Sequence, residues 1–265
     1  MIIVVGNGIA GSCLSRHLTD RGLRHLVVSA GAPDSMAAAA LLRRGYHHGD
    51  ELALFDRSLE LFKTWGVDVQ SGGWVTNYRK PGKRPHEEAD WHILDPRAPL
   101  VSADVQAFAV RHDQGVLVGD PTDAELIKAD RVFWATGAVD ATGITHGVTW
   151  THPDPAVLTS PGRLRLHHYA PYKTIVAARV GGVARLGSSS AKSANTALTQ
   201  AERMLATAAE VGMIRSLQGW RAVTGLRCKG TNETPAGIHF GIVGFHRTGY
   251  AIAPAATERF VERAL

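Results

Sequence analysis

The chain opens with a glycine-rich turn between two short apolar runs, and this arrangement restricts the fold more than any other feature. Ile2–Val5 reads as a strand, Gly6–Gly11 follows it at once, and a helical pattern covers Ser12–Arg21. A second apolar run, Leu26–Val28, closes the unit. Strand, glycine turn, helix and strand in this order form the βαβ unit that binds dinucleotides.

Each glycine of the turn has its own expected task. Gly6 permits the tight turn, Gly8 lets the backbone approach a pyrophosphate, and Gly11 lets the helix pack against the strand. The helix N-terminus, with the backbone of Ile9 and Ala10, offers N–H groups and a partial positive charge to phosphates. A purely structural glycine turn is the alternative, but the position after a strand and before a helix favours dinucleotide binding.

Composition argues against membrane-spanning, disulfide-rich, metal-binding and nucleic-acid-binding proteins. The chain has 265 residues, of which 45% are hydrophobic and 20% charged, and its longest apolar runs fall short of the ~20 residues that span a bilayer. Two cysteines make neither a disulfide framework nor a metal cluster, so we expect a reducing, cytoplasmic location. No charged segment precedes the apolar run Ile2–Val5, so we do not expect a signal peptide. The 13 histidines show no metal-ligand spacing. The net charge of +5 suits an anionic small molecule, and we expect neither nucleic acid nor membrane as a partner.

Hydrophobic periodicity along the rest of the chain predicts helices, strands and one long loop. The small residues of Met36–Leu42 indicate a closely packed helix, and Arg131–Gly137 reads as a buried strand that ends in a glycine turn. Gly181-Gly182 marks a hairpin between two strands of a β-rich block. We further expect helices over 50–65 and 196–213, strands over 71–78, 220–226 and 238–244, a loop over 79–99, and a terminal helix opened by Pro254.

Two glycine turns with arginines, separated by one strand, mark the C-terminal part of the chain. Gly225-Leu226-Arg227 begins the first, and Gly244–Tyr250 forms the second. Together with the glycine turn at the start, the segments 37–42, 129–137 and 185–188 complete a series of motifs in a fixed order. In this series the sequence resembles the FAD-dependent oxidoreductases of the D-amino-acid oxidase and glycine oxidase type.

The resemblance implies an α/β fold, in which a Rossmann-like FAD-binding domain is interleaved with a β-rich substrate domain. The FAD-binding domain is expected over 1–75, 100–150 and 230–265, and the substrate domain over 76–99 and 151–229. The family's chemistry is the oxidation of a C–N bond in an amine or amino acid, with hydride transfer to flavin N5 and oxygen as acceptor, giving an imine and hydrogen peroxide. The expected partner is thus a small-molecule amine or amino acid, with a homo-oligomer left open.

The resemblance also assigns roles to matched positions. Arg227 is expected to bind a substrate carboxylate, with a structural salt bridge as its alternative role, and Arg247 is the second substrate-side arginine. With His246 and Tyr250 they form the expected catalytic set, although a surface-turn role for His246 is equally compatible. The expected FAD contacts are Gly6, Gly8, Ile9, Ala10, Gly11, Ser29, Ala30, Ser35, Ala37, Ala38, Thr136, Gly137, Gly225, Gly244, His246, Arg247, Thr248, Gly249 and Tyr250.

Four features depart from the family pattern. Ser29 stands where an acidic residue usually binds the ribose, Cys228 replaces a proline, Asn232 replaces an aspartate, and the chain is shorter than the family norm in 76–110 and 138–165. These departures leave open a non-catalytic nucleotide-binding member of the fold. A nicotinamide-dependent reductase is a further alternative, against which the C-terminal turn and the lack of a second GxGxxG argue.

Overall fold

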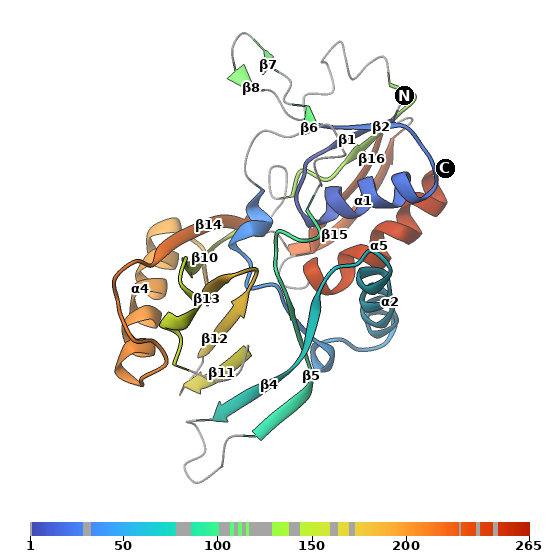
Figure 1. The fold of residues 1–265 in the computed structure, drawn as a ribbon. Coiled ribbons are helices and arrows are strands. Elements are labelled where there is room, and N and C mark those ends of the chain that lie inside the picture. The colour runs from blue at the N-terminus through green and yellow to red at the C-terminus, as the bar shows by residue number, and fades with distance from the viewer. Residues whose placement is uncertain are drawn as a thin grey trace.

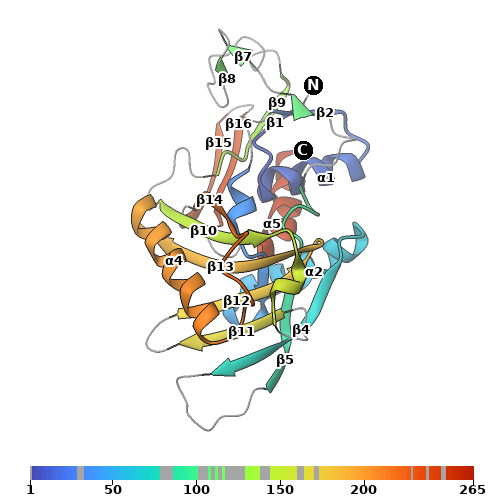
Figure 2. The same ribbon diagram turned by 60° about the vertical axis from the view of Figure 1, so that its left-hand side comes forward.

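Two β-sheets with helices packed against them organise the chain (Figure 1). The computed structural model describes residues 2–28, 33–77, 86–100, 107–108, 111–112, 115–116, 129–137, 144–159, 164–169, 173–227, 229–236, 239–245 and 249–265. Helices α1, α2 and α5 gather beside one sheet, and α4 covers the other, as a second view also shows (Figure 2). Among the described residues, no helix combines the length and apolar composition needed to cross a bilayer.

The first sheet contains the predicted βαβ unit. Within the described residues it has six strands in the order β15-β16-β9-β1-β2-β6. Strand β1 lies between β2 and β9 and pairs with both in parallel, so the carboxyl ends of these three strands meet at one edge. The first sheet and its helices are β1 (Ile2–Val5), α1 (Ile9–Asp20), β2 (His25–Val28), α2 (Asp50–Thr64), β6 (Ala107–Phe108), β9 (Arg131–Trp134), β15 (Lys229–Ala236), β16 (His239–Phe245) and α5 (Gly249–Ala264).

The second sheet is largely antiparallel. In the described residues it has eight strands in the order β14-β10-β13-β12-β11-β4-β5-β3, and a separate pair of strands joins β7 (Arg111–His112) to β8 (Gly115–Val116). Gly181 and Gly182 connect β12 to β13 with φ of 62° and 75°, which confirms the predicted hairpin, since two positive φ values define a type I′ turn. The elements of this sheet are β3 (Leu41–Arg43), β4 (Val69–Asn77), β5 (His86–Leu94), β10 (Thr145–His152), β11 (Leu164–Tyr169), β12 (Lys173–Val180), β13 (Val183–Ala191), α4 (Ala194–Glu210) and β14 (Arg221–Arg227), with 3₁₀ turns η1 (Asp34–Ala37), η2 (Arg44–Tyr46) and η3 (Pro155–Val157).

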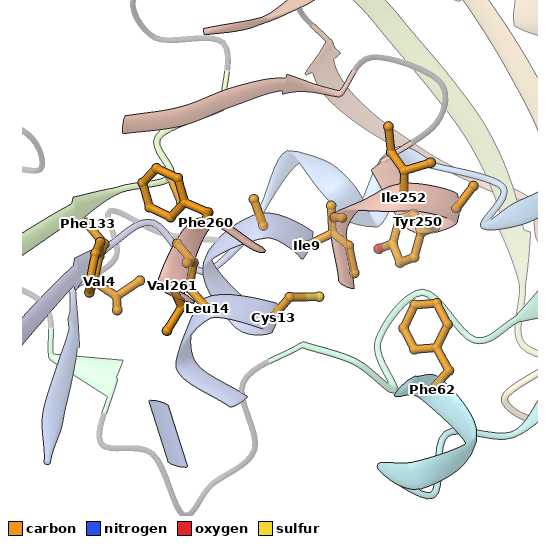
Figure 3. Packing of buried hydrophobic residues seen from close by; sticks show 14 of the residues in the cluster. Val4, Ile9, Cys13, Leu14, Phe62, Phe133, Tyr250, Ile252, Phe260 and Val261 are labelled. Atoms are coloured by element: carbon orange, nitrogen blue, oxygen red, sulfur yellow. The ribbon is translucent and has the colours of Figure 1, made fainter. Parts of the chain in front are cut away.

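The largest apolar core lies where α1, α2 and α5 meet the first sheet (Figure 3). Phe133 of β9 packs edge-on against Phe260 of α5, and Leu14 of α1 is fully buried in the same cluster. The apolar spacing that predicted a helix over 50–65 is confirmed, because Phe55 and Phe62 of α2 are both fully buried. This core fixes α1, and with it the glycine turn, against the sheet.

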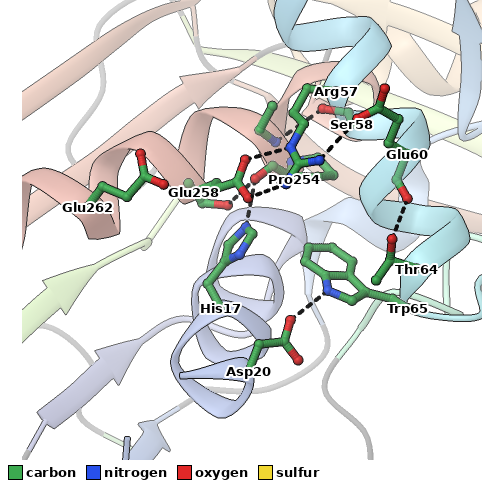
Figure 4. Close-up of polar contacts among 12 residues, drawn as sticks. His17, Asp20, Arg57, Ser58, Glu60, Thr64, Trp65, Pro254, Glu258 and Glu262 are labelled. Carbon is green, nitrogen blue, oxygen red and sulfur yellow. Dashed lines mark hydrogen bonds and ion pairs between the residues drawn. The ribbon is translucent and has the colours of Figure 1, made fainter. Parts of the chain in front are cut away.

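Polar contacts tie the three helices together at the edge of this core (Figure 4). Arg57 of α2 donates to both carboxylate oxygens of Glu258 of α5, at 2.9 and 2.7 Å. His17 of α1 donates through Nε2 to the carbonyl of Pro254, at 2.8 Å. Since a carbonyl can only accept, Nε2 of His17 carries a proton in this contact.

We expect the stability of the fold to decline as the pH falls below the ordinary histidine range, partly through His17. Burial lowers the pKa of His17, against the opposing effects of Pro254 and Glu258. The unfolded chain therefore takes up this proton first, so stability is lost as the pH falls below about 6.5. Urea unfolding at a series of pH values should show a weaker pH dependence in His17→Gln, which keeps an N–H donor, than in the wild type. Equal pH profiles for the two proteins would contradict this assignment.

Three predictions of local structure are wrong. Met36–Leu42 forms η1 and the start of β3 instead of a helix, because Ala40 has a left-handed backbone with φ of 51°. Residues 86–94 of the predicted loop form β5, whose buried Trp91 and Ile93 pack on the second sheet. Pro254 lies inside α5, which begins at Gly249, and the next N–H, of Ala255, bonds to Ser58 Oγ of α2 at 3.2 Å. The strands β10 and β15 were not predicted at all.

Candidate functional site

The glycine turn packs so closely that two of its glycines cannot be replaced. Gly6 follows β1 with φ of 103°, and a Cβ there would lie 2.4 Å from the carbonyl oxygen of Ala135. A Cβ on Gly11 would lie 1.8 Å from the carbonyl oxygen of Gly6. These two positions therefore serve the packing of α1 on the turn and on the end of β9.

Gly8 differs from its two neighbours because it faces a hydroxyl. It is the N-cap of α1 with an ordinary φ of −66°, and a Cβ there would lie 3.2 Å from Ser35 Oγ. The same Oγ accepts the N–H of Ile9 at 2.9 Å. The absence of a Cβ at Gly8 thus leaves room for Ser35 at the helix N-terminus.

The N-terminus of α1 keeps unused donors. The N-cap residue, Gly8, has no side chain that could cap the helix, and the first turn of α1 holds no acidic residue. Within the described part of the chain, the N–H groups of Ala10 and Gly11 have no hydrogen-bond acceptor, since the first intrahelical bond is made by Ser12 to Gly8 at 2.9 Å. Free N–H groups and the helix dipole make this end suited to an anion such as a phosphate.

The second sheet holds the segment that carries Ser35. Gly225 of β14 approaches it so closely that a Cβ would lie 2.5 Å from the carbonyl oxygen of Asp34. The N–H of Leu226 donates to Asp34 Oδ1 at 3.0 Å. The backbone of Arg227 follows as the last residue of β14, paired with Thr145, so the predicted carboxylate-binding position lies next to this segment in the fold.

Tyr250 points into the same region from α5. Its hydroxyl is within hydrogen-bond distance of the carbonyls of Ser35, at 3.0 Å, and Pro96, at 2.9 Å. Burial raises the pKa of this phenol, which keeps it protonated and able to donate. The structure thus places Tyr250 in contact with the Ser35 segment, and Gly249 begins the helix immediately before it.

Thr136 and Gly137 follow β9 at the carboxyl edge of the first sheet. The Thr136 nitrogen would lie 3.3 Å from a Cβ on Gly6, so this turn and the glycine turn are neighbours. Gly137 has φ of 72°, with nothing within 4 Å of a Cβ, and is exposed. Ligands of open α/β sheets bind at this edge, where the carboxyl ends of parallel strands meet.

The structure brings most of the predicted cofactor positions together around Ser35 and the α1 N-terminus. Ala37 and Ala38 continue the Ser35 segment, and Gly244 lies in β16, which pairs with β9 in parallel. Ser29, Ala30, His246, Arg247 and Thr248 lie outside the described residues.

Two residues of this region were not predicted. Arg185 of β13 is buried and donates through Nη2 to the carbonyls of Met36 and Ala38, at 2.7 and 3.1 Å. Thr149 of β10, which is also buried, donates through Oγ1 to the carbonyl of Ala37. One signal in the sequence could have revealed Arg185. It is a charged residue between Ala184 and Leu186 in an apolar strand, and a charged side chain at such a position is rarely buried without a specific partner.

The described residues hold no group of three or more histidine, cysteine, aspartate or glutamate side chains that could bind a metal ion. What they do assemble is an anion-binding helix end, a hydroxyl group beside it, and a segment of small residues between two sheets. Such an arrangement can hold the phosphates and the body of a dinucleotide.

Comparison with known proteins identifies the fold. No family model and no curated protein sequence matches this chain. Solved structures do match: glycine oxidase from Bacillus cereus (TM-score 0.63, 14% identity, 99% of this chain and 94% of that chain) and L-proline dehydrogenase from P. horikoshii (0.66, 14%, 99% and 93%). An FAD-dependent oxidoreductase from Pseudomonas aeruginosa is similar as well (0.61, 16%, 99% and 89%). The chain has the fold of these enzymes over nearly its whole length, which confirms the expected fold class.

Proposed function

We propose that the chain is an FAD-dependent oxidoreductase that oxidises the C–N bond of a small amine or amino acid. The observation that carries the proposal is the N-terminus of α1, where unused N–H groups and Ser35 Oγ converge beside Gly8. The fold similarity supports the same conclusion, because glycine oxidase and iminodiacetate oxidase are among the matching structures. When bound, FAD supplies the hydride acceptor, and oxygen reoxidises it with release of hydrogen peroxide.

The residues present fit FAD at this place. The N–H groups of Ala10 and Gly11 would hold the phosphates, and the Ser35 hydroxyl, which accepts from Ile9, would donate its own proton to a phosphate oxygen. Thr136 and Gly137, at the carboxyl edge of the first sheet, would be the further contacts of the cofactor in this proposal. Left-handed Ala40 ends the segment that carries Ser35, and backbone strain of this kind concentrates at ligand sites.

The second sheet provides the substrate side in this proposal. Arg227 binds the substrate carboxylate in a bidentate fork, which orients the carbon next to the amine nitrogen, and Arg247 and His246 complete the substrate side. We propose the division expected from the sequence, with 1–75, 100–150 and 230–265 for the cofactor and 76–99 and 151–229 for the substrate, except that β3, β4 and β10 go with the second sheet to which they belong. The chemistry needs no dedicated base, because the protein's task is to orient the substrate and exclude water.

Anaerobic reduction tests the reaction class. The protein is reconstituted with FAD and mixed without oxygen with glycine, an N-methyl amino acid, D-amino acids, L-amino acids and glycerol 3-phosphate in separate samples. We expect an amino acid to bleach the visible flavin absorption and glycerol 3-phosphate to leave it unchanged. Bleaching by glycerol 3-phosphate alone would overturn C–N oxidation, and bleaching by NADPH alone would favour a nicotinamide-dependent reductase.

Gly8→Ala separates cofactor binding from folding. The added methyl group lies 3.2 Å from Ser35 Oγ and displaces it from the helix end, while the φ of −66° suits alanine. We expect the dissociation constant of FAD to rise on the order of tenfold, as for the loss of one hydrogen bond to a charged group, with the free energy of unfolding reduced by less than about 1 kcal/mol. Fluorescence titration and urea unfolding measure the two effects.

Ser35→Ala provides the matched comparison for Gly8→Ala. If both changes act through the Ser35 hydroxyl, the double variant binds FAD no more weakly than the weaker single variant. If the losses of FAD binding free energy add in the double variant, Gly8 and Ser35 act independently, and Gly8 does not act through the Ser35 hydroxyl.

A further inference from the structure

Arg185 is buried, and its hydrogen bonds within the described part of the chain go to backbone carbonyls. It lies in β13 with 3% of its surface exposed, and its Nη2 donates to Met36 and Ala38. Its Nε is buried without a hydrogen-bond partner in the described residues. Burial lowers the pKa of its guanidinium. An arginine with an unsatisfied buried donor costs stability, so packing alone does not account for this residue.

The carbonyls that Arg185 bonds belong to a segment held along its whole length. Thr149 of β10 donates to the carbonyl of Ala37, and the single hydroxyl proton of Tyr250 is shared between the carbonyls of Ser35 and Pro96. With the two bonds from Arg185, the carbonyls of residues 36, 37 and 38 each accept a hydrogen bond from the second sheet. If the segment moves, buried donors on the second sheet lose their acceptors.

This segment carries the hydroxyl at the helix end. Ser35 Oγ lies 2.9 Å from the Ile9 nitrogen, so the position of the backbone at 35–38 fixes where the hydroxyl stands relative to α1. A binding site that is ordered before the ligand arrives loses less conformational entropy on binding. The second sheet therefore contributes to affinity at the first sheet's edge without touching the phosphates.

We propose that Arg185 is a positioning residue for the cofactor, which acts by holding residues 35–38 so that Ser35 meets the N-terminus of α1. The proposal rests on the proposed binding of FAD. It assigns to the eight-stranded sheet a second task besides substrate binding, namely the ordering of the cofactor site through one buried side chain.

Arg179 offers a matched control. It lies on the neighbouring strand β12 and also donates to two backbone carbonyls, those of Pro155 and Leu158. Those acceptors belong to η3 and the residue after it, away from the Ser35 segment. Arg179→Met therefore removes an equivalent pair of hydrogen bonds from the same sheet and leaves residues 35–38 in place.

The test compares wild-type protein with Arg185→Met, Arg185→Lys and Arg179→Met. Two quantities are measured: the dissociation constant of FAD by fluorescence titration, and the amide hydrogen exchange of residues 33–42 without FAD. We expect Arg185→Met to raise the dissociation constant at least tenfold and to speed exchange in 33–42. Arg185→Lys retains a donor for one carbonyl and should therefore restore part of the FAD affinity and part of the protection from exchange. Arg179→Met should bind FAD within twofold of wild type.

Should Arg185→Met fail to fold, Thr149→Val takes its place, because valine has the same shape as threonine and removes only the donor to Ala37. Wild-type affinity and unchanged exchange in the folded variants would overturn the positioning role while FAD binding stands. A wild-type protein that takes up no FAD would instead overturn the proposed function, and the role of Arg185 with it.

Discussion

Gly11→Ala is expected to unfold the protein or to lower its free energy of unfolding by at least about 3 kcal/mol. The new methyl group would stand 1.8 Å from the carbonyl oxygen of Gly6, a backbone atom that cannot move without displacing the turn between β1 and α1. Gly6 is itself confined, because its left-handed backbone lies against Ala135. The clash therefore separates α1 from the sheet and opens the largest core.

Gly45→Ala is the matched control for this change. Gly45 lies in η2, has no positive φ, and has nothing within 4 Å of the place that a Cβ would take. A glycine-to-alanine change at such a place keeps or slightly raises stability, because it narrows the unfolded ensemble. Urea unfolding of the two variants compares them directly. Equal midpoints would mean that α1 does not press on the glycine turn as described.

Arg227→Ala is expected to lower kcat/KM for substrates with a carboxylate on the order of 100-fold or more, while FAD binding stays within about twofold of wild type. A bidentate arginine–carboxylate contact consists of two charge-assisted hydrogen bonds, and alanine removes both. The cofactor contacts that we propose lie elsewhere, on the N-terminus of α1 and on Ser35. Steady-state oxygen consumption and FAD titration measure the two quantities.

Arg221→Ala tests whether any charge loss on β14 has the same effect. Arg221 begins the strand that Arg227 ends, roughly 20 Å away along an extended backbone, and it is exposed. We expect it to leave both activity and FAD binding unchanged. If Arg227→Ala loses FAD in proportion to activity, Arg227 has a structural role, and if it retains full use of amino acids, the carboxylate lies elsewhere.

The sequence was most informative where the determinants of structure are local. Gly6 and Gly11 were predicted to serve the turn and the helix packing, and both glycines have no room for a side chain. Short-range spacing also revealed α2 through Phe55 and Phe62. The spacing of Gly6 and Gly11, like that of Phe55 and Phe62, lies within a short stretch and is visible in the chain, although Ala135, which crowds Gly6, comes from a distant part of the sequence.

Residues that meet only in the folded chain escaped prediction. Thr149 and Arg185 come more than 110 residues after the segment that they hold. Thr149 stands in no recognised motif, and the motif 185–188 indicated a strand and turn but not the contact that Arg185 makes. Trp91 and Ile93 alternate with polar residues in a stretch whose charge and prolines indicated a loop, and pairing with β3 and β4 makes it a strand. At these positions tertiary packing, and not local composition, determines the structure.

The most direct test of the account is the binding of FAD to the purified chain at the N-terminus of α1. Titration of the protein into FAD, followed by the quenching of flavin fluorescence, is run beside identical titrations of Gly8→Ala and Arg179→Met. The account predicts saturable binding of one FAD per chain, weakened by Gly8→Ala and unchanged by Arg179→Met. Absence of binding, or binding that Gly8→Ala leaves intact, would contradict it.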